Sequence, residues 1–401
     1  MAAEVTIVGG GLVGLTVALA LSRQGHAVTL MESADLRQAQ PAELDARSIA
    51  LSYSTVQILR ALSVWPLLQP HAAPIQHIHV SSAGHFGVTR LEASQVGVEA
   101  MGYVIEYHLL LEGLLQAVKA EQGITLMTPA QLNVLRPFSD RVEISYQYHA
   151  EERTQDCALL VIADGGRSDI RDKLAIPVNT HDYHQSAIVA NLRIEQAMQG
   201  KAFERFTAQG PLAMLPLPRR RYAMVWTHTP EKAEALLGLT DEDFLQQLYQ
   251  VFGHRLGLFS AIGQRARFDL RLSRASQLVT GRCVLIGNAA NTLHPVAGQG
   301  FNLALRDVAQ LYDCLGEIDL GSDALLSALA RYAQLRATDQ DRTVGLGNSL
   351  ISAFSNDLPL WNHLRAGALA ALDLCPTLKN EFAWQGMGYG EGCSSLMRGQ
   401  V

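Results

Sequence analysis

Three glycines near the start of the chain are spaced to hold the diphosphate of a dinucleotide. They are Gly9, Gly11 and Gly14. The apolar, β-branched residues 5–8 before them predict a strand, and the periodic residues 12–21 predict a helix. Gly9 permits a tight turn, Gly11 lets the backbone approach the diphosphate, and Gly14 allows close packing of helix on strand. The partial positive charge of the helix N-terminus would then face the phosphates.

An acidic residue stands where a ribose would lie. Residues 27–31 predict a second strand, and Glu32 follows it directly. At this distance from the glycines a carboxylate can accept hydrogen bonds from ribose hydroxyls. The alternative is a glycine-rich turn without a ligand. The order of strand, turn, helix, strand and acid favours a dinucleotide, without deciding which one.

Two later segments decide the kind of ligand. Residues 159–163 form a buried-strand pattern that runs into Asp164 and Gly165, and residues 283–286 run in the same way into the Gly/Pro-rich loop 287–302. Ligands of open α/β sheets bind at such strand ends. A ligand held by both ends of the chain must be long, and FAD meets that requirement.

The glycine fingerprint, the Asp-Gly turn and the late loop occur in the order of three family motifs. The chain resembles the FAD-dependent aromatic hydroxylases of the p-hydroxybenzoate hydroxylase-like class over most of its length. Within that class it resembles the ubiquinone-biosynthesis hydroxylases, nearest to the 2-octaprenyl-6-methoxyphenol hydroxylases. The segments that carry this likeness are residues 45–50, 163–168, 203–207, 210–216 and 287–307. Asn288 replaces the family's usual aspartate, and an amide can still bond a flavin hydroxyl.

The resemblance implies which residues contact FAD. Arg47 is expected near the phosphates and ribityl chain, and the loop from Pro295 to Gly300 beside the isoalloxazine ring. An ordinary turn is the alternative for Asp164 and Gly165. The implied cofactor-binding residues are Gly9, Gly11, Leu12, Val13, Gly14, Glu32, Arg47, Asp164, Gly287, Asn288, Pro295, Gly298, Gln299, Gly300 and Asn302. The family often has an arginine just after Glu106, where Tyr107 stands here.

The resemblance also implies the reaction. FAD takes electrons from NADPH or NADH, reacts with O₂, and hydroxylates the ring of 2-polyprenyl-6-methoxyphenol through a flavin C4a-hydroperoxide. The chemistry belongs to the cofactor, so we assign no catalytic acid or base. A related hydroxylase acting at another ring carbon, or a catalytically silent flavoprotein scaffold subunit, remain alternatives. A plain NAD-dependent dehydrogenase would leave the late loop unexplained.

Residues for the substrate are expected between the flavin loop and a second sheet. The candidates are Phe203, Arg205, Leu215, Trp226 and Pro295. The first four could equally form the core of that sheet. His77 and His79 lie two residues apart on a predicted strand, but no third ligand has suitable spacing, so we predict no metal site.

The predicted fold class is α/β. A Rossmann-like FAD-binding domain is expected to be interleaved with a smaller substrate domain that has a mixed or antiparallel sheet. The FAD-binding domain is predicted to comprise residues 1–75, 100–178 and 277–345. The substrate domain is predicted to comprise residues 76–99 and 179–276. Residues 346–401 are expected to form a helical C-terminal region. Residues 360–372 could be an amphipathic docking helix, but packing on their own domain is favoured.

Composition indicates which partners and which compartment to expect. A net charge of −6 argues against nucleic acid, and 48% hydrophobic residues predict a large core. The five cysteines lack metal-type spacing and are expected to be thiols in a reducing cytoplasm. We recognise neither a leader nor a transmembrane segment. The expected partner is a prenylated phenol as substrate. Three further possibilities are kept: peripheral contact with a membrane, a homo-oligomer and a biosynthetic complex.

Overall fold

The computed structural model describes residues 3–36, 47–84, 87–196, 198, 200–292, 299–354, 373–389 and 393–400. Three predictions fall on other residues. Pro295 and Gly298 of the late loop, and the helix expected at 360–372, lie outside the described part of the chain.

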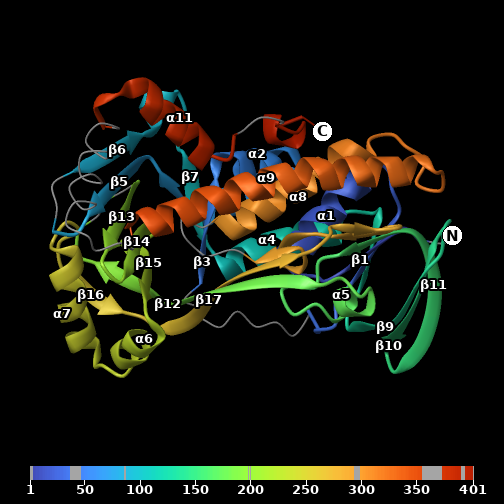
Figure 1. Ribbon diagram of the computed structural model, residues 1–401, viewed down its shortest axis with the longest axis horizontal. Coiled ribbons are helices and arrows are strands. Elements are labelled where there is room, and N and C mark those ends of the chain that lie inside the picture. The colour runs from blue at the N-terminus through green and yellow to red at the C-terminus, as the bar shows by residue number, and fades with distance from the viewer. Residues whose placement is uncertain are drawn as a thin grey trace.

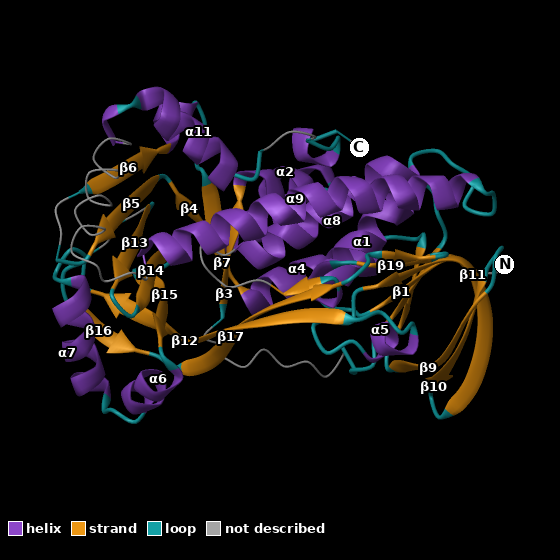
Figure 2. Ribbon diagram, viewed as in Figure 1, coloured by secondary structure: helices purple, strands orange, loops and turns teal. Residues whose placement is uncertain are grey.

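Parallel strands form the centre of the first sheet. β1 (Ala3–Val8) lies between β2 (Val28–Met31) and β11 (Glu151–Ile162), and both run parallel to it. All four residues of β2 are buried, as expected for a strand covered on both faces. α1 (Leu12–Arg23) and α4 (Tyr107–Ala120) pack on one face (Figure 2). The other described strands of this sheet are β8 (Ile124–Met127), β9 (Ala130–Pro137), β10 (Val142–Tyr148), β18 (Val279–Thr280) and β19 (Cys283–Leu285).

A second sheet lies beside the first, at the left of Figure 1. A hairpin of β5 (His77–Ser82) and β6 (Val88–Glu92) forms one edge of it. Neighbouring strands are antiparallel except for β13 and β5, which run parallel. The remaining described strands are β12 (Val178–Ile194), β13 (Lys201–Thr207), β14 (Gly210–Leu217), β15 (Arg221–His228), β16 (Phe259–Ile262), β17 (Ala266–Ala275) and β20 (Asn291–Thr292).

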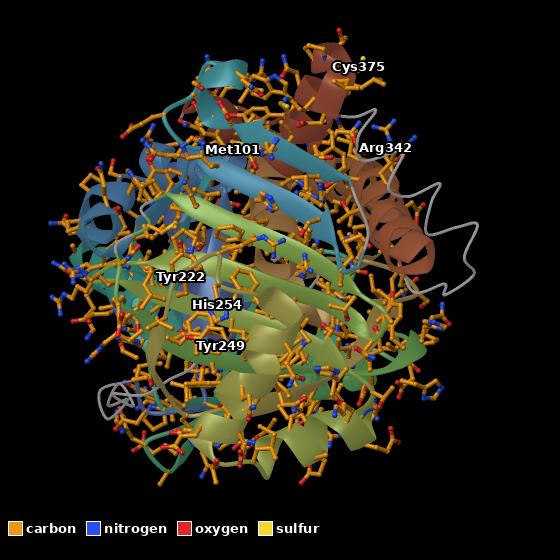
Figure 3. All side chains as sticks on the ribbon, turned by 90° about the vertical axis from the view of Figure 1, so that its left-hand side faces the viewer. Met101, Tyr222, Tyr249, His254, Arg342 and Cys375 are labelled. Carbon is orange, nitrogen blue, oxygen red and sulfur yellow. The ribbon has the colours of Figure 1, made fainter. Side chains whose placement is uncertain are left out.

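Two helices cover the outer face of the second sheet. They are α6 (Pro230–Leu237) and α7 (Asp241–Phe252). The Thr240 side chain caps α7 by accepting a hydrogen bond from the Asp243 N–H at 3.2 Å. Figure 3 looks onto this side and labels Tyr222 of β15 and Tyr249 of α7. The opposite face of the sheet is therefore the one that can meet a ligand.

A small antiparallel sheet connects the two larger ones. It consists of β3 (Ser48–Ser52), β7 (Gly102–Glu106) and β4 (Ala73–Ile75). Glu106 at the end of β7 accepts two hydrogen bonds from the Arg221 guanidinium of β15, both 2.9 Å long. This paired contact fixes the second sheet relative to the small one. The fold class is confirmed, whereas the exact domain boundaries stay a prediction.

The C-terminal helices cross the first sheet (Figure 1). α8 (Gln299–Leu315) and α9 (Ala324–Phe354) pack along each other. The remaining described helices are α2 (Tyr53–Ala61), α3 (Trp65–Leu68), α5 (Asp169–Lys173) and α11 (Pro376–Gly386). No helix in the described ranges combines the length and apolar character needed to span a membrane.

Buried charges join α8 to α9. The Arg336 guanidinium lies 2.6 Å from Asp307 and 2.6 Å from Asp339, and only 4% of its side chain is exposed. Burial raises the pKa of Asp307, while the Arg336 charge opposes that rise. The second carboxylate oxygen of Asp307 also accepts a hydrogen bond from the Gly287 N–H at 3.4 Å.

Replacing Arg336 by methionine should destabilise the fold strongly. Asp307 would keep a buried carboxylate without its counter-ion, a loss of about 3–5 kcal/mol in unfolding free energy. The loss should shrink as the pH falls, because protonation removes the uncompensated charge. Urea denaturation at pH 7 and pH 5 measures both effects. Arg331→Met, at an exposed position of α9, is the control, and equal small changes in both variants would contradict the argument.

Candidate active site

A cavity of about 960 Å³ lies between the glycine turn and the inner face of the second sheet. It brings together segments from the start, the middle and the end of the chain. Eight of the predicted cofactor residues line it: Gly11, Leu12, Val13, Arg47, Asn288, Gln299, Gly300 and Asn302. The predicted substrate residues that line it are Phe203 and Leu215.

The three glycines of the fingerprint do three different things. A methyl group on Gly14 would come within 1.8 Å of the Gly9 carbonyl oxygen, so helix and strand touch there. A methyl group on Gly9 would come within 2.3 Å of the Ala163 carbonyl oxygen, and the φ of Gly9 is +109°. At Gly11 nothing lies within 4 Å of that position. The open side of Gly11 is the place where a diphosphate can reach the backbone.

Glu32 holds the glycine turn and faces the ribose position. One carboxylate oxygen accepts a hydrogen bond from the Gly10 N–H at 2.6 Å, and the other accepts one from the Ala34 N–H at 2.8 Å. The Ser33 hydroxyl donates a third hydrogen bond to this carboxylate at 3.1 Å. A carboxylate has about four acceptor sites, so capacity for one ribose hydroxyl remains. The carboxylate thus stands at the end of β2, as the sequence predicted.

The late loop touches the fingerprint directly. A methyl group on Gly287 would lie 3.1 Å from a side-chain methyl of Val13. The Arg171 guanidinium donates hydrogen bonds to the Ala289 carbonyl oxygen at 3.1 Å and to the Gly166 carbonyl oxygen at 3.4 Å. This buried arginine, which the sequence analysis missed, joins the late loop to the Asp-Gly turn. Its position at the start of a short helix gives no sequence signal for that contact.

Asp164 has one oxygen bonded and one without a partner. The Ser168 hydroxyl donates to one oxygen at 2.8 Å. The other is buried and accepts no hydrogen bond from the described residues. Burial raises the pKa of this carboxyl group. Its neighbours Ala163 and Gly165 line the cavity, so a ligand hydroxyl could complete the hydrogen bonding.

Arg47 is placed over an aromatic ring. Its guanidinium carbon lies 4.4 Å from the centre of the Tyr107 ring, and both residues line the cavity. Stacking of this kind orients a guanidinium, which suits an anionic ligand oxygen. Tyr107, to which the sequence analysis gave no role, therefore helps to position Arg47.

Asn302 fastens α8 to the small sheet. Its amide oxygen accepts hydrogen bonds from the Ser52 N–H and the Thr55 hydroxyl, each 2.8 Å long, and its amide nitrogen donates to the Ala50 carbonyl oxygen at 2.9 Å. The residue was predicted to bind the cofactor. Because these hydrogen bonds engage its amide group, the contacts of Asn302 serve to place the first turn of α8 at the cavity.

Arg205 and Trp226 lie away from the cavity. The Arg205 guanidinium donates to the Val251 carbonyl oxygen at 2.7 Å, and the Trp226 ring packs edge-on against Phe244 with centroids 5.7 Å apart. These contacts place both side chains on the α7 side of the sheet. Alternate residues of a strand point to opposite faces, so these side chains point away from the cavity. We therefore leave these two out of the candidate substrate site and keep Leu215. Phe203 borders the cavity, but its ring packs edge-on against Phe252 of α7 with centroids 5.4 Å apart.

The residues present fit FAD. The open backbone at Gly11 and the uncapped N-terminus of α1 line one cavity. Glu32 bonds the neighbouring Gly10 N–H, and Asp164, with its unpartnered oxygen, lies between the lining residues Ala163 and Gly165. The first turn of α8 also opens onto the cavity. Within the described part of the chain, no cluster of His, Cys, Asp or Glu suits a metal ion, and this includes His77 and His79.

Comparison with known proteins agrees with this geometry. The family model of the FAD binding domain matches residues 2–344. The structure of p-nitrophenol 4-monooxygenase PnpA from Pseudomonas putida DLL-E4 superposes with a TM-score of 0.80 over 98% of this chain and 99% of that one, at 15% sequence identity. The fold is that of the flavin-dependent monooxygenases.

Curated relatives narrow the family. Ubiquinone hydroxylase UbiL of Rhodospirillum rubrum is 35% identical, covering 99% of this chain and 93% of the relative. The 3-demethoxyubiquinol 3-hydroxylase of Escherichia coli is 31% identical, covering 94% and 96%. The chain belongs to the FAD-dependent hydroxylases of ubiquinone biosynthesis.

Two glycine substitutions should separate cofactor binding from folding. Gly11→Ala adds a methyl group to open space where the diphosphate would lie, so FAD affinity should fall at least tenfold, or about 1.4 kcal/mol, while the apoprotein keeps its melting temperature. Gly14→Ala should instead cost more than about 4 kcal/mol of stability through backbone overlap. Flavin absorbance and thermal denaturation of apoprotein measure the two effects. Full FAD binding by Gly11→Ala would contradict the assignment.

Proposed function

We propose that this chain hydroxylates the ring of a prenylated phenol, 2-polyprenyl-6-methoxyphenol, with FAD, O₂ and NADPH or NADH. The observation that carries the proposal is a single cavity with the glycine turn and α8 at one end and an apolar sheet face at the other. A phenol on that face would lie against the flavin. The names of the relatives support a substrate from the ubiquinone pathway.

The residues of the chain bind and orient the cofactor. Gly11 and the N-terminus of α1 would hold the diphosphate, and Glu32 a ribose. Arg47 and Asn288 would contact the phosphates and the ribityl chain. Gln299 and Gly300 would lie beside the flavin ring. Bound FAD would supply the redox chemistry between NAD(P)H and O₂.

The cavity walls exclude water and position the substrate. In the overall reaction, one oxygen atom of O₂ enters the ring and the other leaves as water, while NAD(P)H and a proton supply the two electrons and two hydrogens. Ala213, Leu215 and Val225 present an apolar surface to the ring. Phe382 and Met387 of the C-terminal region line the same cavity and would cover the substrate.

Purified protein should be yellow and should oxidise NAD(P)H faster when a short-chain prenylated methoxyphenol is added. The reason is that the filled cavity aligns the ring with the flavin. Visible spectra, NADPH and NADH oxidation under air, and mass spectrometry of the product test this. Gain of one oxygen atom on the ring is expected, and its position names the carbon.

The flavin-deficient Gly11→Ala variant serves as the control. Oxygenation at another ring carbon would favour a sister hydroxylase of the pathway. A yellow protein that oxidises no NAD(P)H with any phenol would contradict the proposal and favour a scaffold flavoprotein.

A further inference from the structure

One carboxyl group stands on the wall that the second sheet gives to the cavity, among mostly aliphatic residues. Glu204 lies in the middle of β13, directly opposite Val80 of β5 and Ala213 of β14 in the strand register. All three line the cavity. The Glu204 side chain is half-buried, and its open side is the cavity itself.

The neighbouring strands continue this apolar row. Ala213 pairs with Val225, and Val225 pairs with Val189 of β12. Among the lining residues that the structure describes, the ionisable ones are Glu204, Arg47 and Tyr107. Arg47 and Tyr107 stack on each other at the flavin side. Glu204 therefore is the ionisable group of the sheet face, where the substrate ring would lie.

The carboxylate of Glu204 lacks a partner within the described ranges. Burial alone perturbs it, and it raises the pKa of Glu204 from 4.5 to about 7. Two other shielded carboxylates have counter-ions: Glu106 has Arg221 and Asp307 has Arg336. A shielded carboxylate without such a partner is costly unless a ligand supplies the hydrogen bond.

The charged groups nearest in sequence and register face the other way. Arg205 bonds the Val251 carbonyl oxygen on the outer face. His79 alternates with Val80, so it lies on that outer face too, opposite Arg90 of β6. β14 contributes no titratable side chain (Gly210–Leu217). No charge on these elements thus faces Glu204 from the cavity side.

We propose that Glu204 is a catalytic residue of the proposed reaction: its carboxylate accepts the hydrogen bond of the substrate's ring hydroxyl and takes its proton. This rests on the proposed function. The phenolic O–H bond breaks, and the proton forms an O–H bond with a carboxylate oxygen. The electron pair stays on the phenolic oxygen and delocalises onto the ortho and para carbons, which become more nucleophilic. The proton later leaves to water.

The pH dependence follows from the shifted pKa. A base must be ionised, so oxygenation should rise with pH as Glu204 ionises around pH 7. Stability should change in the opposite sense. The folded state holds its proton above the ordinary pKa of 4.5, so this group's contribution to stability is lost as the pH rises through about 7.

Glu204→Gln, which keeps the shape and removes the base, tests the role. We expect oxygenation to fall roughly 100-fold and its rise around pH 7 to disappear, while the flavin spectrum stays unchanged and substrate still stimulates NAD(P)H oxidation. Glu204→Asp should keep the pH dependence at a reduced rate. The matched control is Glu242→Gln, at an exposed position of α7, which should behave as wild type.

Two further measurements do not depend on turnover. Wild-type protein should bind a 2-methoxyphenol more tightly than its O-methyl ether. This difference in affinity should increase as the pH rises through 7. In Glu204→Gln the difference should not depend on pH. Glu204→Gln should also melt at a higher temperature than wild type at pH 8, with the difference vanishing near pH 5.

The outcomes separate the two proposals. If the Glu204→Gln variant oxygenates the phenol at the wild-type rate and with the wild-type pH profile, the role of Glu204 is overturned, while the proposed hydroxylase activity stands. A wild-type protein that oxygenates no phenol overturns the proposed function itself. An equal loss in Glu204→Gln and Glu204→Asp, with the pH dependence of ligand binding retained in Glu204→Gln, would reduce Glu204 to a structural residue and overturn the proposal.

Discussion

The contact between the first helix and the first strand is the constraint on which the site depends. α1 approaches so closely at Gly14 that even a methyl group would overlap the Gly9 carbonyl oxygen. This approach directs the α1 N-terminus at the cavity and leaves Val13 against Gly287 of the late loop. A helix held farther away would lose both the phosphate-facing backbone and the seat of that loop. The cofactor site is thus a product of backbone packing before any side chain contributes.

One buried carboxylate anchors both ends of the late loop. Asp307 belongs to α8, whose first turn takes up the last residues of the loop, and it accepts a hydrogen bond from the N–H of Gly287, where the loop begins. Arg336 of α9 compensates its charge. The Asn302 amide then fixes the first turn of α8 to the small sheet. An ion pair between two C-terminal helices therefore helps to place Gly287 and the first turn of α8, which lines the cavity.

Much of this arrangement could be predicted from the sequence because it rests on local backbone patterns. The glycine turn, Glu32 and the two strand ends each have a signal within a few residues. No such local signal shows which face of β13 meets the cavity. Arg205 was predicted to face the substrate, but its side chain points to α7. Period-two alternation says that residues 203 and 205 share a face, and only packing decides which face meets the helix. Arg171 likewise acts through tertiary contacts that no spacing reveals.

The second sheet uses its two faces for different purposes, and β13 shows the consequence. Phe203 and Arg205 pack against α7, which holds the strand rigid, while Ala202, Glu204 and Phe206 line the cavity. A group on such a strand is held more accurately than one on a loop. A carboxyl group there weakens the fold when ionised, because the cavity shields it from water. Aliphatic side chains at the same register would pack without that cost, so the position of Glu204 favours a role in chemistry over one in folding.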